Sequence, residues 1–255
     1  MIGHLWRGAS GLWAQQRRLE MVAHDLANLN TSGYKRGRTG FADLVYRAIQ
    51  EPGRPVGANP SPSLGSGVQP SIMEKDFAPG PLVFTGRDLD LAIEGEGFFL
   101  LLGSQGERLF TRNGRFYIDA EGRLVHVSGS YLDLPPLPQE GEKIAFLPSG
   151  QVKICRGQGE EVLGRLDLYM VPNPGGLEAV GDCLFRETPA SGIALPGAPG
   201  EGGRGRIRSG YLEGPNLDLA EAFSEMILAQ HLFEIAARTI KVSEEMWGLA
   251  NALKR

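Results

Sequence analysis

Large apolar residues recur every seven positions along the last segment of the chain, and a small residue follows each of them three positions later. The large residues are Leu219, Met226, Phe233, Ile240 and Trp247, and the small ones are Ala222, Ala229, Ala236, Ser243 and Ala250. A seven-residue period keeps one face of an α-helix turned toward a partner over many turns, and small side chains let that partner approach closely. We therefore predict a long helix over 219–253 that packs against another helix and is capped at its start by Asp218.

The first segment carries a matching stripe, because Leu5, Leu12, Leu19 and Leu26 also stand seven residues apart. Neither helix can cover its own stripe. We expect the two chain ends to pair with each other, although two helices are too few to enclose both stripes completely. Further copies of the chain would cover what remains, and a head-to-tail contact that does not close produces a helical filament.

The 36 glycines and 17 prolines are concentrated between the helical ends. Short apolar or alternating runs separated by turn residues are typical of antiparallel strands. We expect His126, in one such run, to point outward. The predicted fold class is α+β, a discontinuous N- and C-terminal α-helical coiled coil with an inserted antiparallel β-rich domain. The predicted strands cover 89–93, 98–102, 108–112, 116–118, 124–127, 143–146, 151–155 and 162–171.

These patterns divide the chain into four parts. The linker between the first helix and the strands is assigned from a run rich in proline, glycine and serine. We expect an N-terminal helix of the coiled-coil core domain at 1–33, an extended linker at 34–75, a β-rich outer domain at 76–208, and the C-terminal helix of the core domain at 209–255.

Composition argues against several classes of function. The 26 basic and 30 acidic residues give a net charge of −4, which opposes binding to nucleic acid. No apolar run reaches the roughly 20 residues that span a membrane, so no membrane insertion is expected. The first residues lack the apolar core of a cleaved signal peptide. Cys155 and Cys183 lack the spacing of a metal or redox motif, and whether they form a disulfide is left open.

Groups that could support chemistry are few. The four histidines form no metal-binding or catalytic motif, so we predict no catalytic, cofactor-binding or metal site. An enzyme alternative rests on carboxylates that share a strand face in pairs, Asp88 with Asp90 and Glu94 with Glu96. Solvated strand edges are the simpler interpretation of these residues.

Both ends also carry recognisable motifs. The segment DLANLNTSGYKR at 25–36 closely resembles the motif that ends the N-terminal helix in flagellar rod and hook proteins. The segment SGYLEGPNLD at 209–218 resembles the turn into the last helix of that family. Within the family, DLAIEGEGFF at 90–99 and FTRNGRF at 110–116 resemble distal-rod subunits.

The resemblance implies a structural subunit of the distal rod, which assembles into a helical homopolymer and transmits torque from the motor to the hook. It implies contacts with copies of itself, other rod proteins, the hook protein, the ring proteins that act as a bushing, and the type III export apparatus. It places the subunit in the flagellar basal body outside the inner membrane, after export without a cleaved signal peptide. The alternatives are a proximal-rod subunit, a hook protein, an enzyme that uses the carboxylates above, and a coiled-coil adaptor.

The expected assembly interface combines the apolar stripes with residues of the two terminal motifs. It comprises Leu5, Leu12, Leu19, Leu26, Asn28, Asn30, Gly33, Tyr34, Leu219, Met226, Gln230, Phe233, Ile240 and Trp247.

Overall fold

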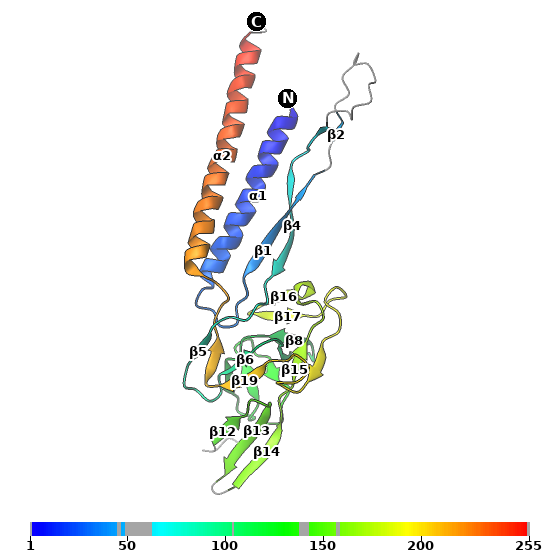
Figure 1. Cartoon of the computed structure of the whole chain (residues 1–255), viewed down its shortest axis with the longest axis vertical. Helices are drawn as coiled ribbons and strands as arrows, with labels where there is room; N and C mark the ends of the chain where they lie inside the picture. The colour runs from blue at the N-terminus through cyan, green and yellow to red at the C-terminus, as the bar shows by residue number, and fades with distance from the viewer. Residues whose placement is uncertain are drawn as a thin grey trace. The chain divides into compact units, whose positions relative to one another are not determined.

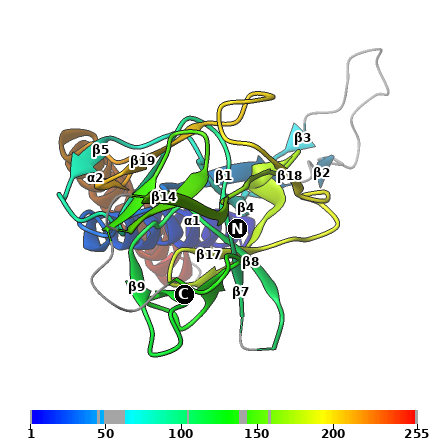
Figure 2. The ribbon, with the colours of Figure 1, turned by 90° about the horizontal axis from the view of Figure 1, so that it is seen from below.

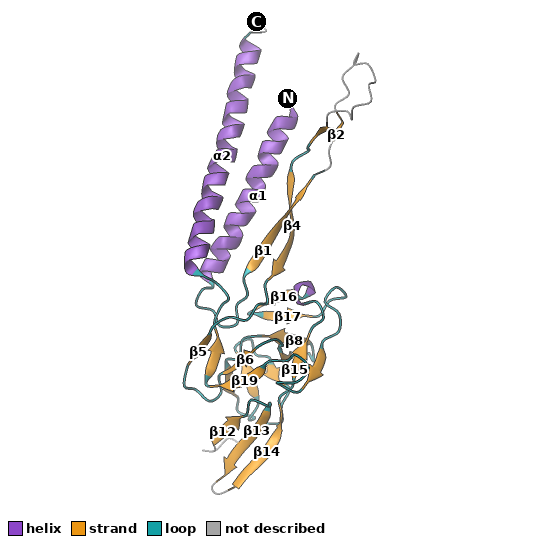
Figure 3. Ribbon diagram, viewed as in Figure 1, coloured by secondary structure: helices purple, strands orange, loops and turns teal. Residues whose placement is uncertain are grey.

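The computed structural model describes residues 2–44, 47–48, 63–103, 105–137, 143–156 and 159–253. The chain folds into two compact units. Both α-helices belong to the first, which we call the helical unit, and most strands belong to the second, the β unit (Figure 3). The predicted α+β class, with a β-rich region between two terminal helices, is confirmed. The helical unit comprises Met1–Leu26, Gly37–Glu74 and Asp218–Arg255, and the β unit comprises Ala27–Arg36 and Lys75–Leu217.

Helices α1 (Ile2–Ala27) and α2 (Leu219–Ala252) lie side by side in the helical unit (Figure 1). They approach so closely at Gly8 that a Cβ atom there would lie 2.8 Å from Cγ1 of Ile240. The predicted pairing of the two chain ends is therefore confirmed. The Asp218 side chain accepts hydrogen bonds from backbone amides of the first turn of α2, as expected for its cap.

A β ribbon lies along α1 in the same unit (Figure 1). The Ser10 hydroxyl on α1 accepts a hydrogen bond from the Val68 amide of the ribbon at 3.3 Å. Part of the stretch expected to be an extended linker thus forms paired strands, while 45–46 and 49–62 lie outside the described residues. Strand β1 (Gly37–Asp43) pairs with β4 (Val68–Lys75), and β2 (Arg47–Ala48) pairs with β3 (Ser63–Leu64).

The β unit is built around a seven-stranded sheet, and every strand pair whose register is described is antiparallel, as predicted. Figure 2 shows its neighbouring strands β17, β8 and β7 from below. In spatial order the strands are β16 (Glu178–Gly181), β17 (Leu184–Arg186), β8 (Arg108–Thr111), β7 (Phe99–Leu102), β11 (Tyr131–Leu132), β10 (Leu124–His126) and β9 (Phe116–Ile118).

Smaller sheets complete the β unit, together with one short 3-10 helix at Pro174–Gly176. One contains β12 (Lys143–Phe146), β13 (Gln151–Arg156) and β14 (Gly159–Arg165). The others are the pairs β15 (Leu168–Met170) with β18 (Leu195–Gly197), β6 (Leu91–Glu94) with β19 (Arg206–Ser209), and β5 (Leu82–Phe84) with β20 (Tyr211–Glu213).

The core of the β unit explains why several of its strands are apolar throughout. Along β7, Phe99 and Leu101 join one buried cluster, whereas Leu100 and the preceding Phe98 join a second cluster on the other face. A strand that is covered on both faces has no solvent-facing positions to alternate with. The rings of Phe99 and Phe116 meet edge to face with their centroids 5.8 Å apart, which fixes β7 against β9.

His126 is buried, with only 2% of its surface exposed, so the expectation that it points outward was wrong. Its strand β10 lies between β11 and β9, and its ring packs edge to face on Phe116. Its Nδ1 lies 2.9 Å from the Ser128 hydroxyl, and its buried Nε2 has no hydrogen-bond partner among the described residues. Burial lowers the pKa of His126 below its ordinary value of 6.5, and the charge of Asp182 partly opposes this.

The two residues that join β16 and β17 adopt an unusual backbone conformation. Asp182 and Cys183 both have positive φ, at +50° and +58°, between Gly181 and its partner Leu184. Two central residues with positive φ are the geometry of a type I′ turn, which favours Asn followed by Gly. Cys183 is a free thiol, and burial raises the pKa of that thiol.

Replacing Asp182 by Asn and Cys183 by Gly should raise the free energy of unfolding by about 0.5–1 kcal/mol, because the new residues adopt positive φ without strain. Urea denaturation of the whole chain measures the change. Cys183→Ala is the control, since it removes the thiol and keeps the strained Cβ. If the Ala variant were stabilised as much as the Asn-Gly variant, backbone strain would not be the cause.

Acidification should destabilise the β unit through His126. The pKa of this residue is lower in the folded than in the unfolded chain, so its contribution to the free energy of unfolding is fully present above pH 6.5. It is lost as the pH falls below 6.5 toward the folded pKa, by at most about 1.4 kcal/mol per pH unit. In His126→Phe the free energy of unfolding should be flatter between pH 7 and pH 5.5. An unchanged pH dependence in that variant would assign the effect to other groups.

Candidate assembly surface

The seven-residue seam predicted on α2 is the face that this helix turns toward α1. Ala222 and Ala229, two of its small residues, are buried, and Met226, Ile240 and Trp247 are half-buried. Phe233 and Leu219 keep 37% and 45% of their surfaces exposed. The alternation of large and small residues thus serves first to pack α2 within its own chain, and it leaves Leu219 and Phe233 partly uncovered.

The predicted stripe of α1 is covered to a similar degree. Leu5, Leu12, Leu19 and Leu26 are all half-buried, and Val22, in the same turns, is buried. Because α2 contacts α1 on one side and the β ribbon contacts it on another, most of the apolar surface of α1 has a neighbour within the helical unit. The residues of this stripe therefore leave little apolar surface for other molecules.

The motif residues that follow α1 belong to the β unit and fix the path of the chain. Asn28 accepts a hydrogen bond from the Thr31 hydroxyl at 3.2 Å, while Asn30 is exposed. Gly33 has a φ of +71°, and a Cβ atom there would lie 2.5 Å from the Asn113 amide nitrogen, so no other residue fits.

Tyr34, the remaining motif residue of the predicted interface, is buried in the β unit. The Lys75 ammonium lies 4.5 Å from its ring centroid and donates to its hydroxyl at 3.3 Å. Gly33 and Tyr34 therefore hold the segment after α1 in place rather than present a surface. Their contribution to assembly stays a prediction, and it would act through this anchoring.

A second apolar stripe, which we call the outer stripe, runs along α2 and was missed in the sequence. Leu228, Ile235, Val242 and Leu249 stand seven residues apart and are 48%, 60%, 49% and 68% exposed. Each follows a large residue of the seam by two positions, which is about 200° around a helix. The two stripes therefore lie on nearly opposite faces. The same seven-residue period, shifted by two, was the signal that could have revealed it.

Helix α1 also exposes two tryptophans at the same spacing. Trp6 is 71% exposed and Trp13 is 46% exposed, and the Arg17 guanidinium lies 5.6 Å from the Trp13 ring centroid. Large exposed apolar side chains that gather in a stripe mark surfaces that bind other molecules. Gln230, the polar residue of the predicted interface, is exposed on α2.

The carboxylates of the enzyme alternative are engaged separately. Glu94 forms an ion pair with Arg208 across β6 and β19 at 2.9 Å, and Arg208 holds the pKa of Glu94 below its ordinary value. Asp90 is buried 3.7 Å from Arg87, while Asp88 and Glu96 are exposed. No group of three or more His, Cys, Asp or Glu residues within the described ranges has the arrangement of a metal site.

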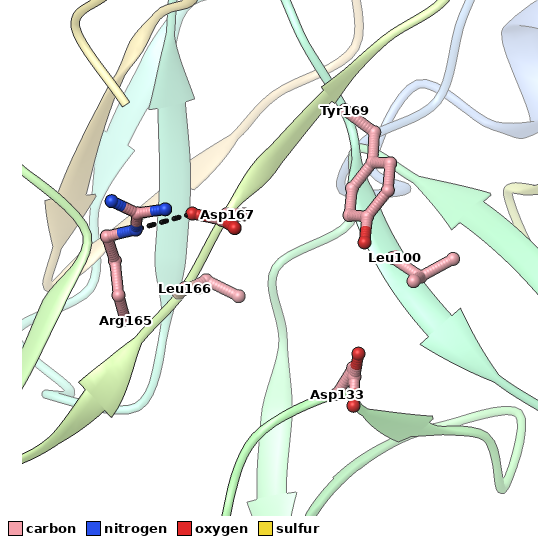
Figure 4. Close-up of a pocket in the computed structure, with 6 residues that line it drawn as sticks. All are labelled: Leu100, Asp133, Arg165, Leu166, Asp167 and Tyr169. Carbon is pink, nitrogen blue, oxygen red and sulfur yellow. Dashed lines mark hydrogen bonds and ion pairs between the residues drawn. The ribbon is translucent and has the colours of Figure 1, made fainter. Parts of the chain in front are cut away.

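A pocket of about 90 Å³ lies in the β unit (Figure 4). Asp133 and the Tyr169 hydroxyl line one side, and Arg165 lies on the other, where its Nε donates to Asp167 at 2.6 Å. Burial raises the pKa of Tyr169. A neutral phenol and an arginine already paired with an aspartate provide no activated nucleophile.

No helix in the described part of the chain combines the length and the apolar composition needed to cross a membrane.

Comparison with protein families matches three segments of the chain. Residues 7–35 match the flagella basal body rod protein family, and residues 92–154 match the D1 domain of the flagellar hook protein FlgE/F/G. Residues 208–253 match the C-terminal region of the flagellar basal body rod FlgEFG proteins. The first match covers the 25–36 motif except for its last residue, the last match includes the 209–218 motif, and the middle one lies in the β unit.

Similar proteins extend over nearly the whole chain. The flagellar basal-body rod protein FlgG of Borreliella burgdorferi is 38% identical over 100% of both chains. Its counterpart in Agrobacterium fabrum is 37% identical over 95% of this chain and 96% of its own, and that of Bacillus subtilis is 33% identical over 100% of both. With this similarity along its full length, the chain belongs to the family of flagellar basal-body rod proteins.

Proposed function

We propose that this protein is a structural subunit of the distal rod, which polymerises into a helical tube and transmits torque from the motor to the hook. The relatives of the FlgG type, which are distal-rod subunits, support this position in the rod. The flagellar basal-body rod protein FlgF of Caulobacter vibrioides is less similar, at 31% identity, which disfavours the alternative of a proximal-rod subunit. The observation that carries the assembly mechanism is the outer stripe of α2.

In a free copy the outer stripe is exposed to water, which is unfavourable for apolar side chains. A partner that covers the stripe therefore stabilises the assembly. Removing a Leu, Ile or Val side chain from water contributes about 1.5–3 kcal/mol, so covering four such residues outweighs much of the entropy lost on association. In this proposal the seam pairs α2 with α1 of the same chain, and the outer stripe docks on another copy. The helices then pack as a coiled coil that continues between copies.

Charge favours a tryptophan face as the docking surface. We assign the outer stripe of one copy to the face of α1 that carries Trp6 and Trp13 on the next. Helix α2 has more acidic than basic residues, among them Glu234 and Glu245, whereas α1 has more basic than acidic ones. Arg17 lies over Trp13 on α1, where it also pairs with Glu20 at 3.1 Å. Since the two faces differ, the contact is heterologous, and a heterologous contact that does not close into a ring produces a helical filament.

The remaining assignments follow from family membership. We infer a purely structural role without enzymatic activity, a core domain built from residues 1–33 and 209–255, a linker at 34–75 and an outer domain at 76–208. The expected partners are other copies, the neighbouring rod proteins, the hook protein, the ring proteins and the type III export apparatus. The subunit would reach the basal body outside the inner membrane by export without cleavage of a signal peptide.

Replacing Ile235 and Val242 by Asp should abolish polymerisation, because each change places a charge in the outer stripe. The free chain should stay folded, since both side chains are exposed. Electron microscopy of purified chain and motility of a strain that carries the variant measure the effect. Lys241→Asp, on the charged side of α2, is the matched control and should assemble. A strain that swims normally with both stripe residues replaced would contradict the proposal.

Replacing Phe233 and Ile240 in the seam by Asp should also stop assembly, but for a different reason. These changes separate α2 from α1 within one chain, so helical content measured by circular dichroism should fall in the free protein while the β unit stays folded. If the seam variants retained full helicity and the outer-stripe variants lost it, the assignment of the two faces would be reversed.

A further inference from the structure

A cluster of three buried charges joins parts of the β unit that are far apart in the sequence. Glu213, at the end of β20, accepts a hydrogen bond at Oε1 from Lys35 Nζ at 2.6 Å. Its Oε2 lies 3.4 Å from Nη1 of Arg112. The side chains of Lys35 and Glu213 are fully buried and that of Arg112 is 2% exposed. One carboxylate therefore serves two cations in the interior.

Backbone groups supply the other contacts of these side chains. Lys35 Nζ also donates to the carbonyl of Ala78 at 2.7 Å, and Arg112 Nη1 donates to the carbonyl of Gly95 at 2.8 Å. The Arg112 guanidinium lies 5.3 Å from the ring centroid of Phe98, and its buried Nε has no hydrogen-bond partner among the described residues. Neutral carbonyls and an aromatic face orient the two cations but do not neutralise them.

The same cluster closes a network between three segments. The Gly33 amide donates to the carbonyl of Glu213 at 2.8 Å, and the Arg36 amide donates to Oδ1 of Asn216 at 2.8 Å. The Asn216 side chain in turn donates to the carbonyl of Asp76 at 2.8 Å. The segment that leaves α1 and the segment that leads into α2 are thus bound to each other.

The cluster contains two positive charges and one negative charge. Removing a cation and removing the anion therefore have different consequences. Burial lowers the pKa of Lys35 and of Arg112, and Glu213 opposes both shifts. Asp76 and Glu96 also favour the charged forms of Lys35 and Arg112 respectively, more weakly. Removing Lys35 would leave a balanced pair, whereas removing the Glu213 charge would leave two like charges in the interior.

We propose that Glu213 acts as a folding checkpoint, such that the segment after α1 closes on the β unit only once the chain up to residue 213 is in place. Before then, Lys35 and Arg112 would have to enter the interior together without an anion, which opposes closure. Glu213 lies near the end of the sequence of the β unit, so when the chain folds from its N-terminus this carboxylate joins after nearly all of that unit. The consequence for assembly rests on the proposed function: an incomplete subunit keeps α1 untethered and cannot join the rod.

Hydrogen exchange of the full-length chain tests this proposal with Glu213→Gln, which keeps the shape of the side chain and removes its charge. The Gly80 amide donates to Oε1 of Glu213 at 2.9 Å. Exchange at Gly33, Arg36 and Gly80 should become about a hundredfold faster, while Leu101 and Phe110 in the central sheet stay protected. Lys35→Met in the otherwise unchanged chain is the matched control, because it leaves Arg112 paired with Glu213. It should retain the protection of Gly33 and Arg36.

A triple variant, Lys35→Met, Arg112→Met and Glu213→Gln, covers the case in which Glu213→Gln unfolds the whole β unit. It removes both cations, so protection at Gly33 and Arg36 should return at least in part. Unchanged exchange in Glu213→Gln, or a loss of protection that the triple variant does not reverse, would overturn the proposal. Since exchange is measured on the free chain, that result would leave the assignment as a rod subunit untouched.

Discussion

The carboxylate of Glu213 is the group that binds together three distant segments of the β unit. It brings together Lys35, 178 residues away in the sequence, and Arg112, 101 residues away. Closing loops of this length costs entropy that grows only slowly with their size, so a few strong contacts can hold them. Buried charges contribute little net stability, but they permit only one arrangement of their partners. Here that arrangement fixes the segment that follows α1 and the segment that precedes α2 against each other.

Helices and strands could be predicted because their signals are local. The seven-residue period gave the extent of α2 and its pairing with α1, and Asp218 gave its first residue, because helical periodicity and capping depend on neighbours a few residues away. The ion cluster could not be predicted in this way. Lys35, Arg112 and Glu213 stand in three of the four motifs on which the family resemblance rests, but nothing within one motif indicates a partner in another. His126 was misassigned for a related reason, since a short run does not reveal that strands will flank it on both sides.

The candidate surface was predicted in part, because the outer stripe was missed. The seam residues Met226, Ile240 and Trp247 were expected to pair with α1 and to leave what remained uncovered to another copy, and α1 of the same chain covers one side of them. A helix that is apolar on two opposite faces has a weak net amphipathic signal, because the contributions of its faces cancel. Only the knowledge of which face α1 occupies identifies Ile235 and Val242 as the uncovered residues. The sequence thus contains both apolar stripes but does not show which of them α1 covers.

Apolar stripes and a buried polar cluster suit two different requirements of the proposed rod subunit, strong contacts between copies and a fixed register within each copy. Apolar stripes such as Leu228 to Leu249 are strong but unspecific in register, because a slip by seven residues restores nearly the same contacts. A polar cluster such as Lys35, Arg112 and Glu213 tolerates no slip, because any displacement leaves a buried charge without its partner. A polymer that bears torque needs both properties. The apolar surface of α2 can supply the strength of contacts between copies, while the register of each subunit is fixed inside its own β unit, where a neighbour cannot disturb it.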